Sequence, residues 1–255
     1  MTMVNGYEAP AAERVGEFLR LGRERGYWRN GYDFPRLCRQ VFGGISLKGK
    51  RVLEIGSGSG VLSMWAGLCG ASEVVALEPL EEGSGSFKRG RIYDDFASMT
   101  RALGLETTRI LPKAVQHFRG EGTFDLVLSN ASINHLDEPN CVTLKSSVQS
   151  REVYLDVLRG IAQDMNRGGK LIIMDVSSEN MFNDLGLTNP FMKTIEWHKH
   201  HTPQLWGEIC SQAGFSEPLI TWPSGRYLRY LRIYSRPSWC SYLTDSLFRL
   251  EMTRS

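Results

Sequence analysis

A glycine-rich turn is the first stretch of the sequence whose residue types suit ligand binding. Glu54 lies within the largely apolar run at 51–55, Gly56, Gly58 and Gly60 follow at alternate positions, and a helical pattern comes next. Glycine permits positive φ and lets a ligand approach the backbone closely. The start of the following helix presents free N–H groups to an anion. The turn therefore predicts a site for the polar end of a cofactor.

A second acidic residue follows the next apolar run. Glu78 directly follows the run at 73–77 and lies about 20 residues after the glycine-rich turn. In nucleotide-binding folds a carboxylate at this offset holds the ribose hydroxyls. A nicotinamide-binding turn would have glycine at 56, 58 and 61, but the chain has Val61. The pair of features favours a ribose-containing cofactor, and a nicotinamide oxidoreductase is the less favoured alternative.

Three of the five histidines lie in "TIEWHKHHTPQLW", residues 194–206. If this segment is extended, Glu196, His198 and His200 share one face, as metal ligands would. No HExxH motif or partner set of cysteines accompanies them, so we expect no metal site. Thr202 suits a helix N-cap and the proline after it suits the first helical position, so the histidines are predicted to end a loop.

Histidine also suits proton transfer near neutral pH. His198 is one candidate general base, and His135 in "NHLDE" is another. Glu196 or Glu138 is placed to orient them. The alternative for each histidine is an exposed or hydrogen-bonded side chain without a chemical role.

An arginine-rich stretch, "GRYLRYLRIYSR", occupies residues 225–236. Its four arginines and three tyrosines suit contact with a phosphate, a carboxylate or single-stranded nucleic acid. The favoured interpretation is an exposed edge strand whose arginines deter pairing with other chains.

The overall composition is that of a globular protein. The 255 residues are 42% apolar and 23% charged, with a formal net charge of +2, so a dedicated nucleic-acid binder is not expected. Five scattered cysteines without CxxC spacing argue against disulfides and predict a cytoplasmic location. The first thirty residues contain no apolar signal-like run, and no run of about 18 apolar residues predicts a membrane span.

Short apolar runs alternate with helical patterns along the middle of the chain, which predicts a doubly wound α/β sheet. Helices are expected over 61–70, 94–104, 151–169 and 203–213. Strands are expected over 51–55, 73–77, 124–130 and 170–176, with a short strand within 107–115 that Pro112 breaks. Two of the three segments after residue 214 are expected to form an antiparallel hairpin at one edge of the sheet.

The ExGxGxG turn with an acid after the second strand resembles class I S-adenosylmethionine-dependent methyltransferases, from about Leu47 to the C-terminus. The resemblance implies a Rossmann-like, seven-stranded and mostly parallel sheet, with S-adenosylmethionine as the cofactor. We therefore expect an N-terminal helical cap over 1–46 and a methyltransferase domain over 47–255. A lid-like insertion is expected at about 177–201.

The resemblance also implies the residues of a cofactor site. The glycine turn would hold the methionine end, Glu78 both ribose hydroxyls, and Asn130 the cofactor from the fourth strand. Lys113 replaces the acid common near the adenine, which leaves the backbone of Ala114 as the contact, and the alternative for Asn130 is a helix cap. The predicted cofactor-binding residues are Glu54, Gly56, Ser57, Gly58, Gly60, Glu78, Pro79, Lys113, Ala114 and Asn130.

The expected activity is methyl transfer to a small-molecule acceptor, with O-methylation favoured. The stretch "IEWHKHHTPQLW…AGF" is similar to a segment of bacterial methyltransferases that are uncharacterised or associated with surface saccharides, which adds glycans to the candidate acceptors. N-methylation needs less help from a base and stays open as an alternative. A nucleic-acid-associated binding protein on the same fold is a second alternative, resting on the arginine-rich stretch. We expect no membrane partner.

Overall fold

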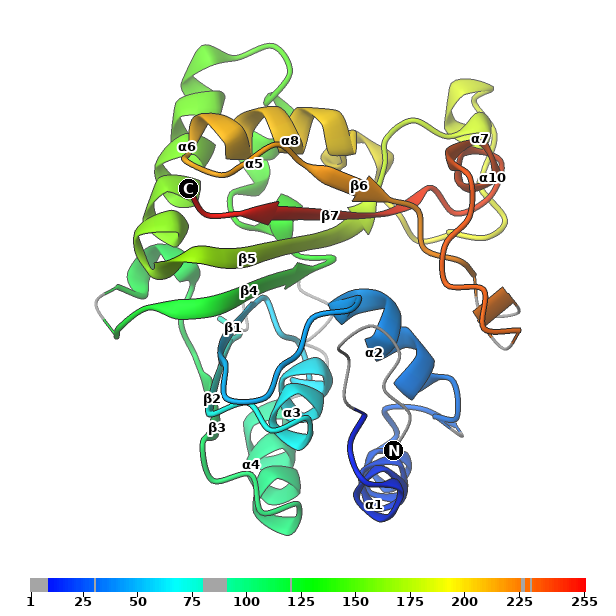
Figure 1. Ribbon diagram of the computed structural model, residues 1–255. Coiled ribbons are helices and arrows are strands. Elements are labelled where there is room, and N and C mark those ends of the chain that lie inside the picture. Colours follow the sequence, from blue (N-terminus) through cyan, green and yellow to red (C-terminus); the bar gives the residue numbers. More distant parts are fainter. Residues whose placement is uncertain (1–8, 30, 80–90, 120, 226–227, 230) are drawn as a thin grey trace.

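The chain folds as an α/β sheet with helices on both faces, as Figure 1 shows. The structure is a computed structural model, and it describes residues 9–29, 31–79, 91–119, 121–225, 228–229 and 231–255. Within these residues no helix is long and apolar enough to cross a membrane.

Seven strands form a single sheet in the part of the chain that is described, in the order β3-β2-β1-β4-β5-β7-β6. The strands are β1 Arg51–Ile55, β2 Glu73–Leu77, β3 Thr108–Leu111, β4 Phe124–Asn130, β5 Met165–Val176, β6 Leu219–Thr221 and β7 Leu247–Thr253. β1 to β5 run parallel, and β7 pairs antiparallel with both β5 and β6. The predicted seven-stranded, mostly parallel sheet is confirmed.

The strand order reverses at β1, which lies between β2 and β4. In an open parallel sheet the two connections leave such a point toward opposite faces, and a crevice opens beyond the carboxyl ends of the strands. The glycine-rich turn follows β1 directly. The topology therefore places this turn at the position where ligands bind in such folds.

Helices cover both faces of the sheet (Figure 1). One face carries α5 Glu138–Val142, α6 Val148–Gln163 and α8 Pro203–Gln212. The other carries α1 Ala12–Glu24, α2 Phe34–Phe42, α3 Val61–Leu68 and α4 Ile92–Ala102. Two short helices, α7 Met181–Asp184 and α10 Ser238–Tyr242, lie beyond the carboxyl end of β5.

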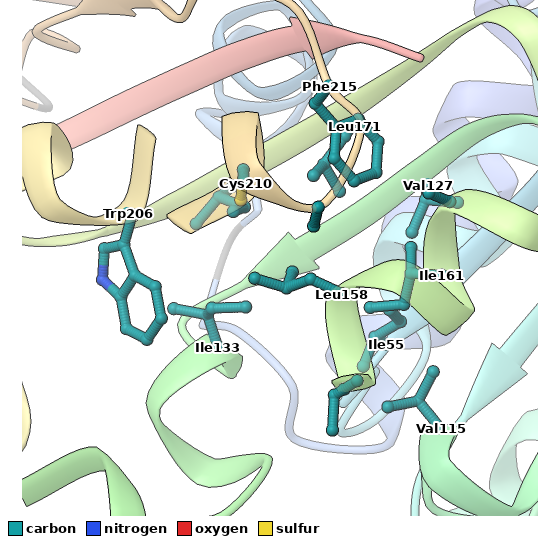
Figure 2. Close-up of a cluster of buried hydrophobic side chains, with 14 of the residues drawn as sticks. Ile55, Val115, Val127, Ile133, Leu158, Ile161, Leu171, Trp206, Cys210 and Phe215 are labelled. Atoms are coloured by element: carbon teal, nitrogen blue, oxygen red, sulfur yellow. The ribbon is translucent and has the colours of Figure 1, made fainter. Parts of the chain in front are cut away.

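Two hydrophobic clusters follow from the alternation of side chains along the strands. On β5, Leu171 and Ile173 join the cluster beneath α6 and α8, whereas Ile172 and Met174 join the opposite cluster. Figure 2 shows the first cluster, in which Trp206 of α8 lies close to other apolar side chains of the helices and strands. Because β5 is apolar on both faces, it is buried between the two helical layers, as predicted for a central parallel strand.

The predicted N-terminal cap shares the second cluster. The ring of Phe18 in α1 lies 5.9 Å from that of Trp65 in α3, and Phe34 at the start of α2 lies 5.8 Å from Trp65. The guanidinium of Arg14 donates to the carbonyl of Leu103 at the end of α4. The two cap helices are therefore packed onto the same core as the sheet.

The arginine-rich stretch at 225–236 differs from its prediction as an exposed edge strand. The edge strand on this side of the sheet is β6, whereas Arg229 and Tyr234 of the stretch contact α2 or the residue directly before it; Arg226, Tyr227 and Tyr230 are outside the described residues. The guanidinium of Arg229 bonds the carboxylate of Asp33, with a distance of 3.1 Å from Nε to Oδ2. The stretch itself contains no acidic residue, and Asp33, which is distant in the sequence, supplies the ion-pair partner of Arg229.

A second contact strengthens this connection. The side-chain amide of Gln40 in α2 donates to the carbonyls of Ser224, at 3.0 Å, and Tyr234, at 2.7 Å. The guanidinium of Arg39 lies 4.6 Å from the centre of the Tyr234 ring. These contacts tie the segment between β6 and β7 to the N-terminal helices, and Arg229 and Tyr234 serve packing within the chain.

Candidate functional site

The glycine-rich turn has the backbone conformation that its sequence predicts. Gly56, Gly58 and Gly60 have φ values of 65°, 54° and 69°, a region that favours glycine. The amide of Ser57 donates to the carbonyl of Leu77 at the end of β2, which holds the turn against the neighbouring strand. The Ser57 hydroxyl is buried and has no hydrogen-bond partner within the described residues. The turn thus presents backbone and an available hydroxyl at the carboxyl edge.

Gly56 packs closely against the loop after β4. A Cβ added at this position would lie 2.4 Å from the Cβ of Ser132, whose hydroxyl donates to the carbonyl of Ile55 at 2.6 Å. Ser132 also contacts the hydroxyl of Ser129 at 2.8 Å. These bonds fix the β4 loop to the end of β1, so the two sides of the predicted cofactor site are connected.

We expect Gly56→Ala to lower the free energy of unfolding by about 3 kcal/mol, from the left-handed backbone and the clash with Ser132. Gly49→Ala is the matched control, because Gly49 has a φ of 71° but a Cβ added there would have no neighbour within 4 Å. That control should cost only about 1 kcal/mol. Urea unfolding of both variants measures the difference, and equal losses would show that close packing at Gly56 is unimportant.

Glu78 lies beside the turn, as the sequence predicts. Its carboxylate is 4% exposed and accepts a hydrogen bond from the Gly58 amide at 2.6 Å. The hydroxyl of Tyr93 in α4 donates to the Glu78 backbone carbonyl. Pro79 follows and is partly exposed. The acid and the glycine-rich turn are therefore adjacent. A cofactor whose ribose binds the acid and whose neighbouring part binds the turn requires this arrangement.

Glu54 points from β1 toward α3, where its carboxylate accepts a hydrogen bond from the Ser63 hydroxyl. Burial raises the pKa of Glu54 to about 7; the Ser63 bonds oppose this increase, and the nearby charge of Glu78 adds to it. A carboxyl group that titrates near neutral pH thus lies directly beneath the glycine turn.

This raised pKa predicts a pH-dependent stability. The unfolded chain releases the Glu54 proton near pH 4.5, whereas the folded chain keeps it until about pH 7. Stability should therefore fall by about 3 kcal/mol as pH rises from 4.5 to 7, and then change no further from this group. We expect Glu54→Gln to remove this decrease in urea unfolding without cofactor, while the exposed control Glu106→Gln keeps it. An identical decrease in Glu54→Gln would contradict the assignment.

At the two predicted adenine contacts, Lys113 and Ala114, the backbone is available to a cofactor but the Lys113 side chain has another partner. Lys113 and Ala114 follow β3 at the carboxyl edge, and Ala114 is partly buried. The Lys113 ammonium lies 3.5 Å from a carboxylate oxygen of Glu121, in the loop that leads into β4. An ammonium engaged by Glu121 leaves the backbone of residues 113–114 as the available contact surface.

Asn130 ends β4 at the same edge and is partly buried. The alternative role as a helix cap does not occur: the side chain of Asp137 caps α5 and that of Ser147 caps α6. Ala131, directly after Asn130, has a φ of 52°, which is unusual for a residue other than glycine. The strand therefore ends in a constrained turn at the predicted cofactor position, a common feature of functional sites.

The two histidine-bearing segments, the loop after β4 and the segment that precedes α8, meet. The ammonium of Lys199 lies 2.9 Å from carboxylate oxygens of both Glu138 and Glu196, and Nδ1 of His135 lies 2.5 Å from Glu138. Lys199 and His135 both lower the pKa of Glu138. His135 and Glu196 are thus members of one surface network of charged groups.

The three histidines before α8 differ in their exposure to solvent. His198 is exposed, whereas His200 and His201 are 8% and 3% exposed. The predicted end of the loop is confirmed, because the Thr202 hydroxyl accepts a hydrogen bond from the Leu205 amide at the start of α8. Since the chain enters α8 at this cap, the two residues directly before it are drawn into the core.

The two buried histidines have different partners. Nε2 of His201 lies 2.6 Å from the carbonyl oxygen of Cys141, which can only accept, so this nitrogen carries the proton. Burial lowers the pKa of His201. Nδ1 of His200 instead lies 3.2 Å from a carboxylate oxygen of Asp175 on β5. Sequence reasoning missed Asp175 because it lies inside an apolar strand pattern.

Within the described chain no group of three or more histidine, cysteine, aspartate or glutamate side chains is arranged to hold a metal ion. The residues instead fit an organic cofactor with a ribose. The three glycines leave the backbone open, Glu78 supplies a buried acceptor, and the Ser57 hydroxyl lacks a partner within the described chain. The same residues were predicted to hold S-adenosylmethionine.

Comparisons with known proteins agree with this geometry. A family model described as "Methyltransferase domain" matches residues 27–217. Ribosomal protein L11 methyltransferase of Leptospira interrogans is 32% identical over 101 residues, which are 39% of this chain and 31% of that protein. The match thus spans about a third of that relative's length.

Solved structures share the fold at low sequence identity. An S-adenosylmethionine-dependent methyltransferase from Aquifex aeolicus has a TM-score of 0.53 and 14% identity, with 95% of this chain and 98% of that chain covered. The mitomycin 7-O-methyltransferase MmcR has a TM-score of 0.54 and 13% identity, with 93% and 60% covered.

Proposed function

Since this chain belongs to the methyltransferase-domain family, we propose that it is an S-adenosylmethionine-dependent enzyme that methylates a hydroxyl group of a small-molecule acceptor. When bound, the cofactor supplies a methyl group activated by a sulfonium. The observation that carries the proposal is the meeting of the β4 loop and the end of the insertion beside β5. Both segments carry histidines, and His201 and Lys199 of the one contact Cys141 and Glu138, which follow the β4 loop.

The chemistry of the acceptor follows from these side chains. A hydroxyl must lose its proton during methyl transfer, and neutral histidine suits that step near pH 7. The protein's other task is alignment, because the activated carbon comes with the cofactor. We propose that the backbone of residues 113–114 and Asn130 contact the cofactor, and that Glu78 binds its ribose hydroxyls.

One protein of the same fold supports an O-methyl product, although it does not identify the acceptor of this chain. MmcR, which shares this fold, is by its name a 7-O-methyltransferase of mitomycin. Glycans remain within the proposed acceptor class through the resemblance of residues 194–206. N-methylation of a small molecule is the second candidate, since an amine acceptor makes less demand on a base.

A methyl-transfer screen tests the proposal. Labelled S-adenosylmethionine is incubated with the full chain and with pools of phenols, sugars, amines and RNA, and the labelled products are identified by mass spectrometry. We expect label on an oxygen of a small molecule. Label on nitrogen would replace O-methylation by the second candidate, and label on RNA would contradict a small-molecule acceptor. Filter binding with RNA at physiological salt checks the binding-protein alternative separately, and we expect no retention.

A further inference from the structure

A buried acid–histidine pair lies at the carboxyl edge of the sheet, outside the residues nominated from the sequence. Asp175 is the second-to-last residue of β5 and is 2% exposed. His200 approaches it from the end of the insertion, with 3.2 Å between Nδ1 and Oδ1. Oδ1 also accepts a hydrogen bond from the Val176 amide, whereas Oδ2 has no hydrogen-bond partner among the described residues. A buried carboxylate oxygen without a partner is costly, so it points to a missing ligand or to a functional contact.

The position of the pair follows from the strand register. Met174 of β5 pairs with Asn130 at the end of β4, and Ser129 of β4 pairs with Ile55 at the end of β1. Adjacent strands lie about 4.8 Å apart, so Asp175 is displaced across the sheet by about 10 Å from the strand that leads into the glycine turn. A small acceptor molecule spans this distance.

The contact between the two side chains favours one histidine tautomer. A carboxylate can only accept hydrogen bonds, so it favours the form of His200 with the proton on Nδ1. The 3.2 Å contact is not aligned as a hydrogen bond, which is common in ligand-free sites and tightens on binding. Nε2 then carries a lone pair, and it has no hydrogen-bond partner in the part of the chain that is described.

The other histidines of this region are less suited to accept a proton from a bound molecule. Nε2 of His201 donates its proton to the carbonyl of Cys141, which leaves the lone pair on Nδ1; that nitrogen is buried without a partner among the described residues, and burial lowers the pKa of this ring. His135 is about half exposed, with Nδ1 engaged by Glu138, and His198 is exposed to solvent. An Nε2 that is free within the described chain and a buried carboxylate beside Nδ1 together favour His200 among the four.

We propose that Nε2 of His200 accepts the proton of the acceptor hydroxyl and that Asp175 is the positioning residue that holds its ring. The inference rests on the proposed O-methylation and names the base of that same site. As the hydroxyl oxygen bonds to the methyl carbon, its proton passes to Nε2 and later to solvent. The carbon–sulfur bond breaks with its electron pair remaining on sulfur.

Nuclear magnetic resonance of the full chain, with 15N in the histidine rings and saturating S-adenosylhomocysteine, tests the tautomer. Single histidine-to-glutamine variants assign the signals, and the exposed His117 serves as the reference for a solvated ring. We expect the His200 ring to carry its proton mainly on Nδ1, and Asp175→Asn to lower the ratio of this tautomer to the other about tenfold. The wild-type measurement stands even if Asp175→Asn fails to fold. A proton mainly on Nε2 of His200 would overturn the proposal.

Addition of phenol and of catechol to the same sample tests contact with a hydroxyl. We expect a saturable shift of the His200 ring signal, reduced at least tenfold in Asp175→Asn, with the His117 signal unchanged. A saturable shift of His135 or His198 in place of His200, or no shift of His200 at all, would overturn the proposal. Calorimetry with S-adenosylhomocysteine tests the cofactor site independently. If that binding fails, the proposed function fails, whereas the tautomer in the free protein still reports on Asp175 and His200.

Discussion

Glu78→Ala should weaken the binding of S-adenosylmethionine by about 10²- to 10⁴-fold. Hydrogen bonds to an ionised group contribute about 1.5–3 kcal/mol each, and we expect this carboxylate to accept one from each ribose hydroxyl. The side chain is buried beside Gly58, where water cannot readily replace it. Titration calorimetry with S-adenosylmethionine and with S-adenosylhomocysteine measures the loss.

The control must separate lost binding from lost structure. In the free protein the Glu78 carboxylate accepts from the Gly58 amide, so its removal also loosens the turn. Urea unfolding without cofactor reports that structural cost. Glu106→Ala changes an exposed acid in the loop before β3 and should bind cofactor as the wild type does. A Glu78→Ala protein that is folded and binds with unchanged affinity would contradict the site.

The second large effect is expected at His200. With an acceptor found in the labelled-methyl screen, His200→Gln should lower kcat by about 10²- to 10⁴-fold, the usual contribution of a general base. The affinity for S-adenosylhomocysteine and the KM for the acceptor should change by only a few-fold, because glutamine keeps a polar side chain of similar size. The variant loses an interaction that is made only in the transition state, in which the proton is transferred, so kcat falls while binding is nearly unchanged.

His117→Gln is the matched control for this prediction, since it removes an exposed histidine outside the proposed site. Its kcat should equal that of the wild type. Asp175→Asn should show an intermediate loss, because the ring of His200 remains but its orienting carboxylate is gone. Full activity of His200→Gln near pH 7 would exclude His200 as the general base. His135, which contacts Glu138, would then be the leading candidate.

The sheet and the glycine turn could be predicted because their signals are local. A five-residue apolar run before three alternating glycines determines strand, turn and helix within a dozen positions, and the structure has β1 and α3 where predicted. Glu78 could be predicted for the same reason, since its place depends only on the length of β2. Helix α6 is a partial exception: it ends at Gln163, because Met165 already pairs with Phe124 as part of β5.

The acceptor side could not be predicted because its contacts join distant parts of the chain. In the sequence, Asp175 is only a polar residue within an apolar strand pattern. The structure shows that His200, from the end of the insertion, contacts it. Likewise, the arginine-rich stretch has no acid of its own, and Arg229 finds its partner in Asp33. One sequence shows the spacing within a segment, but it does not show which segments meet.

A crystal structure of the full chain with bound S-adenosylhomocysteine tests the central claim most directly. We predict that the ribose hydroxyls lie within hydrogen-bond distance of the Glu78 carboxylate, and that the methionine end lies against Gly56–Gly60. The sulfur should face the side of the sheet where Asn130, Asp175 and His200 lie. A cofactor bound elsewhere, or one whose sulfur faces away from the ends of β4 and β5, would contradict the account.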